Sequence, residues 1–208
     1  SADNKLVRIE IGDNPPDSCM AEVFEPPLSV MNPSAYGSGG LHFTSDGIAW
    51  QDWRGSGHFA SFDRNRCADT TDPEATGQSC PEGWTFFAEP LPQLGGVMSS
   101  GSAEASYYTW VDQFNTLGLG TGVPINTGNA SEALLAFVDG KWVVFRVPYP
   151  LGFYTKWLDG RIDDVEGGWK GRGLWATVST RAPFHMEGGK GTTSKVLKFQ
   201  LRSDPLAR

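Results

Sequence analysis

The sequence predicts an all-β protein made of short antiparallel strands. Glycine and proline are frequent, with 26 and 14 among 208 residues, and no long stretch has the periodicity of an amphipathic helix. Short apolar and aromatic runs alternate with turn signals such as Asp-Gly and Gly-Ser-Gly, which supply the positive φ values that tight hairpins need. The length suits one sizeable core, and all-β folds of this size are often single domains.

The clearest group of strands lies between Gly39 and Cys67. Its three runs, LHFT, IAWQDW and HFASFD, are separated by the turn sequences SDG and GSG, which predicts an antiparallel meander. The run WTFFAE at 84–89 is expected to add an outer strand. Further strands are expected at KLVRIEI (5–11), MAEVFEP (20–26), EALLAFV and KWVVFRV around Asp139-Gly140, GLWATVST (173–180) and KVLKFQLR (195–202).

Two stretches are expected to be irregular. The glycine-rich sequence TLGLGTGVPINTGNAS and the polar stretch 151–172 are both expected to be loops. The stretch 103–114 is ambiguous, because its first half could be helical while its second half favours strand. Long loops on a β scaffold are where binding sites usually lie.

Weak self-similarity predicts a repeat architecture. Gly-Ile-Ala-Trp at 47–50, followed by HFASFDR, resembles Gly-Leu-Trp-Ala at 173–176, followed by SKVLKFQLR. A unit recurring every few tens of residues is typical of a β-propeller, whose four-stranded sheets are called blades. We therefore expect about four blade-like units, at 3–27, 36–90, 103–148 and 171–202. The first would hold the third and fourth strands of a blade, and the last would stop at a third strand. The chain is thus expected to be part of a larger propeller, because open edges invite pairing.

A family resemblance points the same way. DNKLVRIEI and AEVFEPP, followed by GGLHFTSDGIAWQDWRGSGHFASFD, resemble the repeat of virginiamycin B lyase-like and NHL-type six-bladed propellers. The segment from GKWVVFRVPYPLGFY to KVLKFQLR is similar to the C-terminal part of long, uncharacterised secreted bacterial proteins of this type. The resemblance implies a propeller fold and a periplasmic origin. The catalytic His and Glu motif of the lyase is not recognisable here, so lyase activity is not carried over.

The acidic charge of the protein limits the kinds of partner that it is expected to bind. The net charge of −7 and the pI of about 4.9 argue against nucleic acid and against an anionic membrane surface. No apolar run approaches the ~20 residues needed to span a bilayer. The expected partner is another polypeptide, either the remaining blades or another subunit, and a small-molecule ligand stays open.

Three cysteines allow one disulfide. Cys67 and Cys80 flank the polar loop ADTTDPEATGQS, and a bridge between them would close it. The alternative is three unrelated buried thiols. With the bridge formed, Cys19 is left over, either buried or free, and the protein belongs in an oxidising compartment such as the periplasm or the cell exterior.

The histidines are the candidate metal ligands. His42, His58 and His185 could converge near a propeller axis and hold a transition metal, with Glu187 or Asp46 adding an oxygen ligand. The alternative is that His42 is a half-buried strand residue and His58 forms a hydrogen bond beside a turn. No His-x-His or His-Glu-x-x-His spacing supports a metal site, and the absence of Cys-x-x-Cys-His excludes covalent haem on sequence.

Two acidic and aromatic groups are candidate binding residues. The first is Trp157, Asp159, Asp163, Asp164 and Trp169, because aromatic faces stack on sugar rings or cations and carboxylates accept hydroxyl hydrogen bonds. Its alternative is a solvated loop held on the core by tryptophans. The second group either faces a cleft or packs between blades: Glu104, Tyr107, Tyr108 and Asp112.

Two functions follow from these residues. One is a secreted or periplasmic binding module whose loop face recognises a ligand or partner chain. The other is a metal-dependent propeller enzyme, a lyase or oxidoreductase, with histidine ligands. Elemental analysis separates them: stoichiometric Cu, Zn or Fe that is lost on His58→Ala favours the enzyme, and finding no transition metal excludes it. The sequence contains no Gly-x-Ser-x-Gly motif to support serine hydrolase chemistry.

Overall fold

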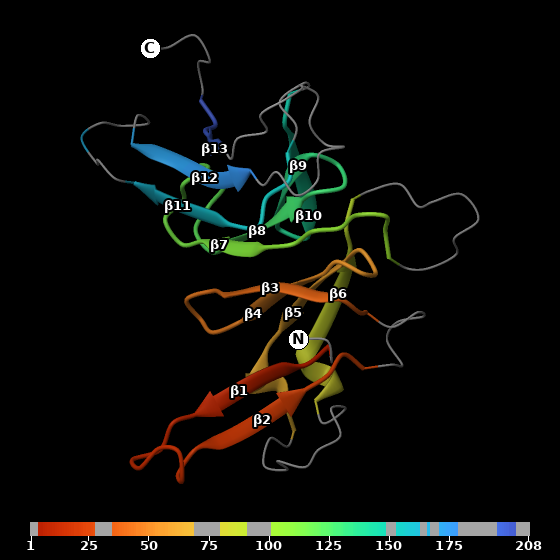
Figure 1. The fold of residues 1–208 in the computed structure, drawn as a ribbon, viewed down its shortest axis with the longest axis vertical. Coiled ribbons are helices and arrows are strands. Elements are labelled where there is room, and N and C mark those ends of the chain that lie inside the picture. Colours follow the sequence, from red (N-terminus) through yellow and green to blue (C-terminus); the bar gives the residue numbers. More distant parts are fainter. Residues whose placement is uncertain are drawn as a thin grey trace.

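The structure, a computed structural model, describes residues 4–27, 35–68, 80–90, 101–148, 153–162, 166, 171–178 and 195–202. Within these ranges the regular elements are β-strands and two short 3₁₀ turns, Arg64–Arg66 and Pro81–Gly83. The strands form four antiparallel sheets (Figure 1). The prediction of an all-β fold is therefore confirmed.

The four sheets follow one another along the chain, and each contains strands that are consecutive in sequence. The first sheet pairs β1 (Leu6–Glu10) with β2 (Met20–Phe24). The second contains β3 (Ser38–Phe43), β4 (Ala49–Trp53), β5 (His58–Phe62) and β6 (Trp84–Ala88). The third contains β7 (Thr109–Asp112), β8 (Val123–Gly128), β9 (Ala133–Val138) and β10 (Lys141–Arg146). The fourth contains β11 (Leu158–Ile162), β12 (Arg172–Val178) and β13 (Lys195–Phe199).

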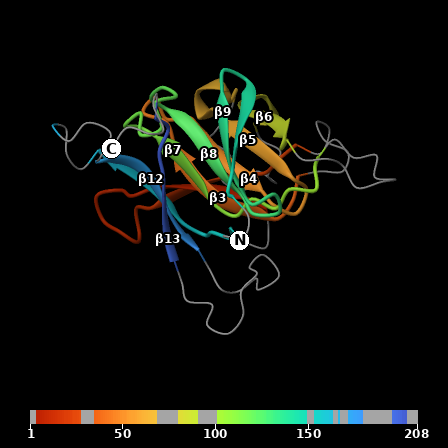
Figure 2. The same cartoon turned by 90° about the horizontal axis from the view of Figure 1, so that it is seen from above.

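The sheets stack face to face in the order of the sequence (Figure 1). Seen from above, the second and third sheets lie over one another (Figure 2). The first strands of neighbouring sheets lie side by side, β3 next to β7 and β7 next to β11. One hydrogen bond across β3 and β7 runs from the Val111 amide to His42 Nδ1 at 3.3 Å. Four-stranded meanders stacked with their first strands together form a partial β-propeller.

The predicted hairpins form as the turn residues require. Gly47, with φ +87°, closes the turn between β3 and β4, and Asp139 and Gly140, with φ of 48° and 77°, connect β9 to β10. β6 lies at the edge of the second sheet beside β5, where WTFFAE was expected. The structure also contains the Cys67–Cys80 disulfide, and Cys19 is free and exposed.

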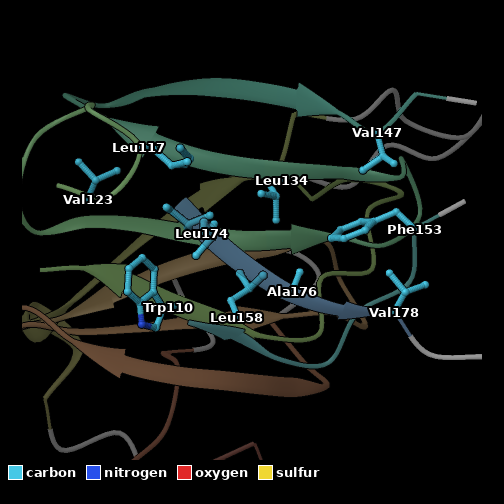
Figure 3. Packing of buried hydrophobic residues seen from close by; sticks show 12 residues of the cluster. Trp110, Leu117, Val123, Leu134, Val147, Phe153, Leu158, Leu174, Ala176 and Val178 are labelled. Atoms are coloured by element: carbon cyan, nitrogen blue, oxygen red, sulfur yellow. The ribbon is translucent and has the colours of Figure 1, made fainter. Parts of the chain in front are cut away.

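Apolar and aromatic side chains fill each space between sheets. The core between the first and second sheets includes Leu6, Phe24, Trp53, Phe62 and Trp84. Between the second and third sheets the rings of Trp50, Phe59, Phe87, Phe137 and Trp142 contact one another. The core between the third and fourth sheets includes Trp110, Leu134, Phe153, Leu158, Leu174 and Ala176 (Figure 3).

Two strands lie in stretches that the sequence predicted to be loops, and both are corrections. β8 contains a proline and a glycine, yet its residues are buried between β7 and β9. Pro124 is tolerated because pairing with β9 begins one residue later, at Ile125. β11 contains Asp-Gly, a turn signal, but the Trp110 indole packs against Gly160, where a side chain would overlap it.

No helix in the described part of the chain is long and apolar enough to cross a membrane.

Candidate functional site

One end of the stacked sheets, which we call the loop face, gathers three connecting segments. They are the β4–β5 turn (54–57), residues 101–108 before β7, and residues 153–157 before β11. The Ser102 amide donates to Ser56 O at 3.2 Å, which ties the second segment to the turn. The Asn129 side chain donates to Thr155 O at 2.9 Å and accepts from the Thr155 amide at 3.0 Å. The loop face is therefore fixed by hydrogen bonds to neighbouring turns.

Two cations converge on one tyrosine at this face. The Arg54 guanidinium carbon lies 4.7 Å from the centre of the Tyr107 ring, and Lys156 Nζ lies 4.1 Å from it. The Tyr154 ring flanks Tyr107 with the two ring centres 6.5 Å apart. Arg54 is exposed and the other three side chains are half-buried, so solvent reaches the cluster. We call Arg54, Tyr107, Tyr154 and Lys156 the cation–tyrosine cluster.

The cluster has a positive local charge in an acidic protein. Hydrogen bonding to Lys156, and then to Arg54, lowers the pKa of the Tyr107 hydroxyl. Neither cation forms an ion pair with a carboxylate among the residues that the structure describes. Cations held together without neutralising carboxylates are characteristic of sites that receive negative charge from a ligand.

Beneath the cluster, Asp52 connects the second sheet to the third. It is fully buried, and its Oδ1 atom accepts hydrogen bonds from the Gly40 amide at 2.5 Å and from Thr109 Oγ1 at 3.2 Å. Burial raises the pKa of Asp52 to about 7. Thr109 Oγ1 also lies 2.8 Å from Asn126 Oδ1, and a hydroxyl has one hydrogen to give. A proton on Asp52 resolves this competition, because Asp52 then donates to Thr109 and Thr109 donates to Asn126.

Glu89 extends the same network. Its Oε1 atom accepts hydrogen bonds from Ser106 Oγ at 2.5 Å and from Asn126 Nδ2 at 2.8 Å. Burial raises the pKa of Glu89 well above its usual value, and the charge of Asp52 raises it further. The network therefore joins two buried carboxyl groups through a threonine and an asparagine, and burial raises the pKa of both.

The second predicted binding group does not form a single site. Its members are Glu104, Tyr107, Tyr108 and Asp112. Glu104 is buried and accepts hydrogen bonds from the Ala130 amide and Ser131 Oγ, both at 2.7 Å, which fix the segment before β7. Asp112 is buried at the other end of β7, where it accepts from the Thr116 amide at 2.8 Å. Tyr107 alone of the four belongs to the cation–tyrosine cluster.

The histidines predicted to hold a metal lie apart where they are described. His58 pairs with Trp53 and His42 pairs with Trp50, so the two point to opposite faces of the second sheet. His58 is 1% exposed, and its Nδ1 atom hydrogen-bonds to Ser56 Oγ at 2.9 Å. His185 and Glu187 lie outside the described residues. Among the described residues no group of three or more His, Cys, Asp or Glu side chains is placed to hold a metal, and a site shared with His185 stays a prediction.

The predicted acidic and aromatic binding residues are described only in part. Trp157, 40% exposed, directly follows Lys156 at the margin of the loop face. Asp159 lies on the face of the fourth sheet that carries Trp175, where it forms an ion pair with Arg161 at 3.5 Å. Asp163, Asp164 and Trp169 lie outside the described residues.

Sequence reasoning missed Arg54 and Lys156. Tyr107 and Lys156 are roughly 50 residues apart, which is about one blade. That spacing was the available signal for Lys156, because both residues lie two positions before the first strand of a sheet, and residues one repeat apart come to the same end of a propeller. Arg54 follows the second strand of its sheet, so no repeat spacing links it to Tyr107.

A separate cavity of about 330 Å³ opens at the opposite end of the second and third sheets. Trp50 and Phe137 form its aromatic wall, and Asp139 stands beside it in the β9–β10 turn. None of the residues that line this cavity belongs to the cation–tyrosine cluster.

No known family profile matches the sequence, and neither does any curated protein. Similar solved structures include a streptogramin B lyase, with 13% identity and a TM-score of 0.42. The match covers 83% of this chain and 38% of the lyase chain. A virginiamycin B lyase from Staphylococcus aureus has 12% identity and a TM-score of 0.49, over 97% of this chain and 50% of that one. A catalytically inactive variant of that lyase with quinupristin has 14% identity and a TM-score of 0.47, over the same shares. The chain thus spans half the length or less of these structures, which belong to the family that its sequence resembles.

Proposed function

We propose that the chain is a secreted or periplasmic β-propeller module that binds a ligand or a partner chain through its loop face. The observation that carries the proposal is the convergence of Arg54, Tyr107 and Lys156 from three separate connecting segments. Loops held at one end of a rigid β scaffold are the usual place for recognition.

Two features support binding at this end. The segments are fixed by Asn129, Ser102 and Glu104, so a ligand would not have to order them. The cluster itself remains open to solvent, because Arg54 is exposed and Lys156 is half-buried. A preorganised and accessible set of polar groups is what a binding site requires.

The Cys67–Cys80 disulfide supports the extracytoplasmic part of the proposal. Stable disulfides form in oxidising compartments and are rare in the cytosol.

A panel of anionic, neutral and cationic small molecules, screened by thermal shift and two-dimensional NMR, tests the proposal. The protein is compared with the double variant Arg54→Ala/Lys156→Ala. Lys198→Ala is the matched control, because Lys198 lies over Trp175, 5.3 Å from its ring centre, on the fourth sheet. We expect molecules that change the melting temperature and the NMR spectrum of the protein and of the control but not those of the double variant. The proposal is contradicted for small ligands if no molecule in the panel binds. It is also contradicted if every molecule that binds the protein binds the double variant equally well.

A further inference from the structure

We infer that the cation–tyrosine cluster is an oxyanion site, in which Arg54, Lys156 and the Tyr107 hydroxyl together hold a carboxylate or phosphate group of the ligand. The inference rests on the proposed function, because it names the ligand chemistry of the same loop face.

The donors at the site match an oxyanion. A guanidinium offers N–H groups in a planar fork, an ammonium offers three, and neither accepts a hydrogen bond. Both cations lie within 5 Å of the centre of the Tyr107 ring, and hydrogen bonding of the Tyr107 hydroxyl to Lys156, and then to Arg54, lowers its pKa. Charge-assisted hydrogen bonds from such groups to carboxylate or phosphate oxygens are among the strongest in proteins.

The protein itself does not neutralise these cations among its described residues. The carboxyl group whose charge acts on Arg54 from beneath is Asp52, but it is buried and directs its Oδ1 atom to Gly40 and Thr109. Its raised pKa keeps a substantial fraction of it uncharged near neutral pH. Arg54 and Lys156 therefore repel each other at the Tyr107 ring, to which both lie close, and an anion that contacts both groups would reduce that repulsion.

The scaffold keeps the two cations together. Arg54 leaves the β4–β5 turn, whose backbone is fixed by hydrogen bonds from the Arg54 amide to Gly37 O and from the Gly55 amide to Tyr36 O. Lys156 follows Thr155, which Asn129 fixes in place, and the Tyr107 backbone is fixed by a hydrogen bond from its amide to Thr127 Oγ1 at 2.9 Å. The site is thus formed before a ligand arrives.

The alternative is that the two cation–π contacts only brace the loops. Such contacts occur roughly once per 70–80 residues, and two on one ring form a denser arrangement than that frequency implies. A bracing role predicts lost stability without anion binding, so the two readings give different results.

Titration with inorganic phosphate and with succinate, each at constant ionic strength, tests the inference. Anion binding would offset the two positive charges, so the pKa of Tyr107 should rise, as followed by phenolate absorbance against the Tyr107→Phe variant. Saturation by phosphate alone identifies a phosphoryl ligand, and saturation by succinate alone identifies a carboxylate. We expect Arg54→Gln and Lys156→Gln each to weaken binding by about tenfold or more, and Lys198→Gln to leave it unchanged.

The absence of saturable binding by either anion overturns the inference, as does binding that both variants retain. The wild-type titration of Tyr107 gives this answer even if a variant fails to fold. Neutral or cationic molecules from the panel that bind the protein but not the Arg54→Ala/Lys156→Ala variant would leave the proposed function standing while removing the oxyanion site. The two failures are therefore distinguishable.

Discussion

Asp52 on β4 and Thr109 on β7 join the second and third sheets through a hydrogen bond of 3.2 Å between Oδ1 and Oγ1. Both side chains are completely buried. The contact between these sheets therefore includes a titratable group as well as an aromatic cluster.

The contribution of Asp52 to the free energy of unfolding should fall as the pH rises from about 4 to about 7. The pKa of Asp52 is about 7 in the folded protein against an ordinary value of 3.8, so the folded state binds more protons in this window. The stability that Asp52 contributes is fully present below its ordinary pKa of 3.8. It is lost as the pH rises through its pKa in the folded protein, about 7. Glu89, with its raised pKa, acts in the same direction.

The Asp52→Asn variant tests this dependence. Asparagine cannot ionise and can still accept the hydrogen bond from the Gly40 amide, so we expect a shallower decline and, at pH 7.5, stability equal to or above that of the wild type. Over this pH range the wild type should lose a few kcal/mol more stability than the variant, at about 1.4 kcal/mol per unit of pKa shift. Denaturant unfolding at several pH values measures it, and identical slopes in both proteins would refute it.

Asn126→Asp should be destabilising, because it replaces the Nδ2 donor that lies 2.8 Å from Glu89 Oε1 with an acceptor. An unpaired buried polar group costs about 1–3 kcal/mol, and a charged one costs more. The loss should be larger at pH 7.5 than at pH 5, where the added carboxyl group is more readily protonated. The exposed Asn65→Asp change is the control and should have little effect under either condition.

Thiol labelling should distinguish the three cysteines. Without reductant the alkylated protein should gain one adduct, at the exposed Cys19, and after unfolding and reduction it should gain three. The double variant Cys67→Ser/Cys80→Ser should lose roughly 3 kcal/mol of stability, as expected for a closed loop of this size. Cys19→Ser should cost little. Three adducts on the native protein in the absence of reductant would show that the bridge does not form.

Gly40→Ala should weaken the association of β3 with β7. A Cβ atom at Gly40 would overlap the Thr109 amide and lie 2.6 Å from Tyr108 Cα, and backbone cannot move aside as a side chain can. At Gly140 a Cβ meets nothing within 4 Å, although its φ is +77°. Gly140→Ala should therefore cost only about 1 kcal/mol of backbone strain, and Gly40→Ala should cost more. Equal losses in melting experiments would argue against close packing of the two strands.

Local patterns predicted most strands because their turns and alternation are encoded within a few residues. The hairpin around Asp139-Gly140 needs only its turn and two apolar runs to be recognised. β8 and β11 were missed because their composition favours loops and only distant partners make them strands. Gly160 in particular is required where the Trp110 indole packs against β11, a contact between residues 50 positions apart that local signals do not contain.

The sequence by itself determined the class of fold, the meanders and the cysteine pair, since these depend on residue type, turn chemistry and short separations along the chain. Only the tertiary structure decided how the functional groups meet. Arg54, Tyr107 and Lys156 come together because stacking the sheets brings loops from successive repeats to one end. Asp52 and Glu89 have raised pKa values because the same stacking removes them from water, and burial of a carboxyl group depends on the whole fold around it.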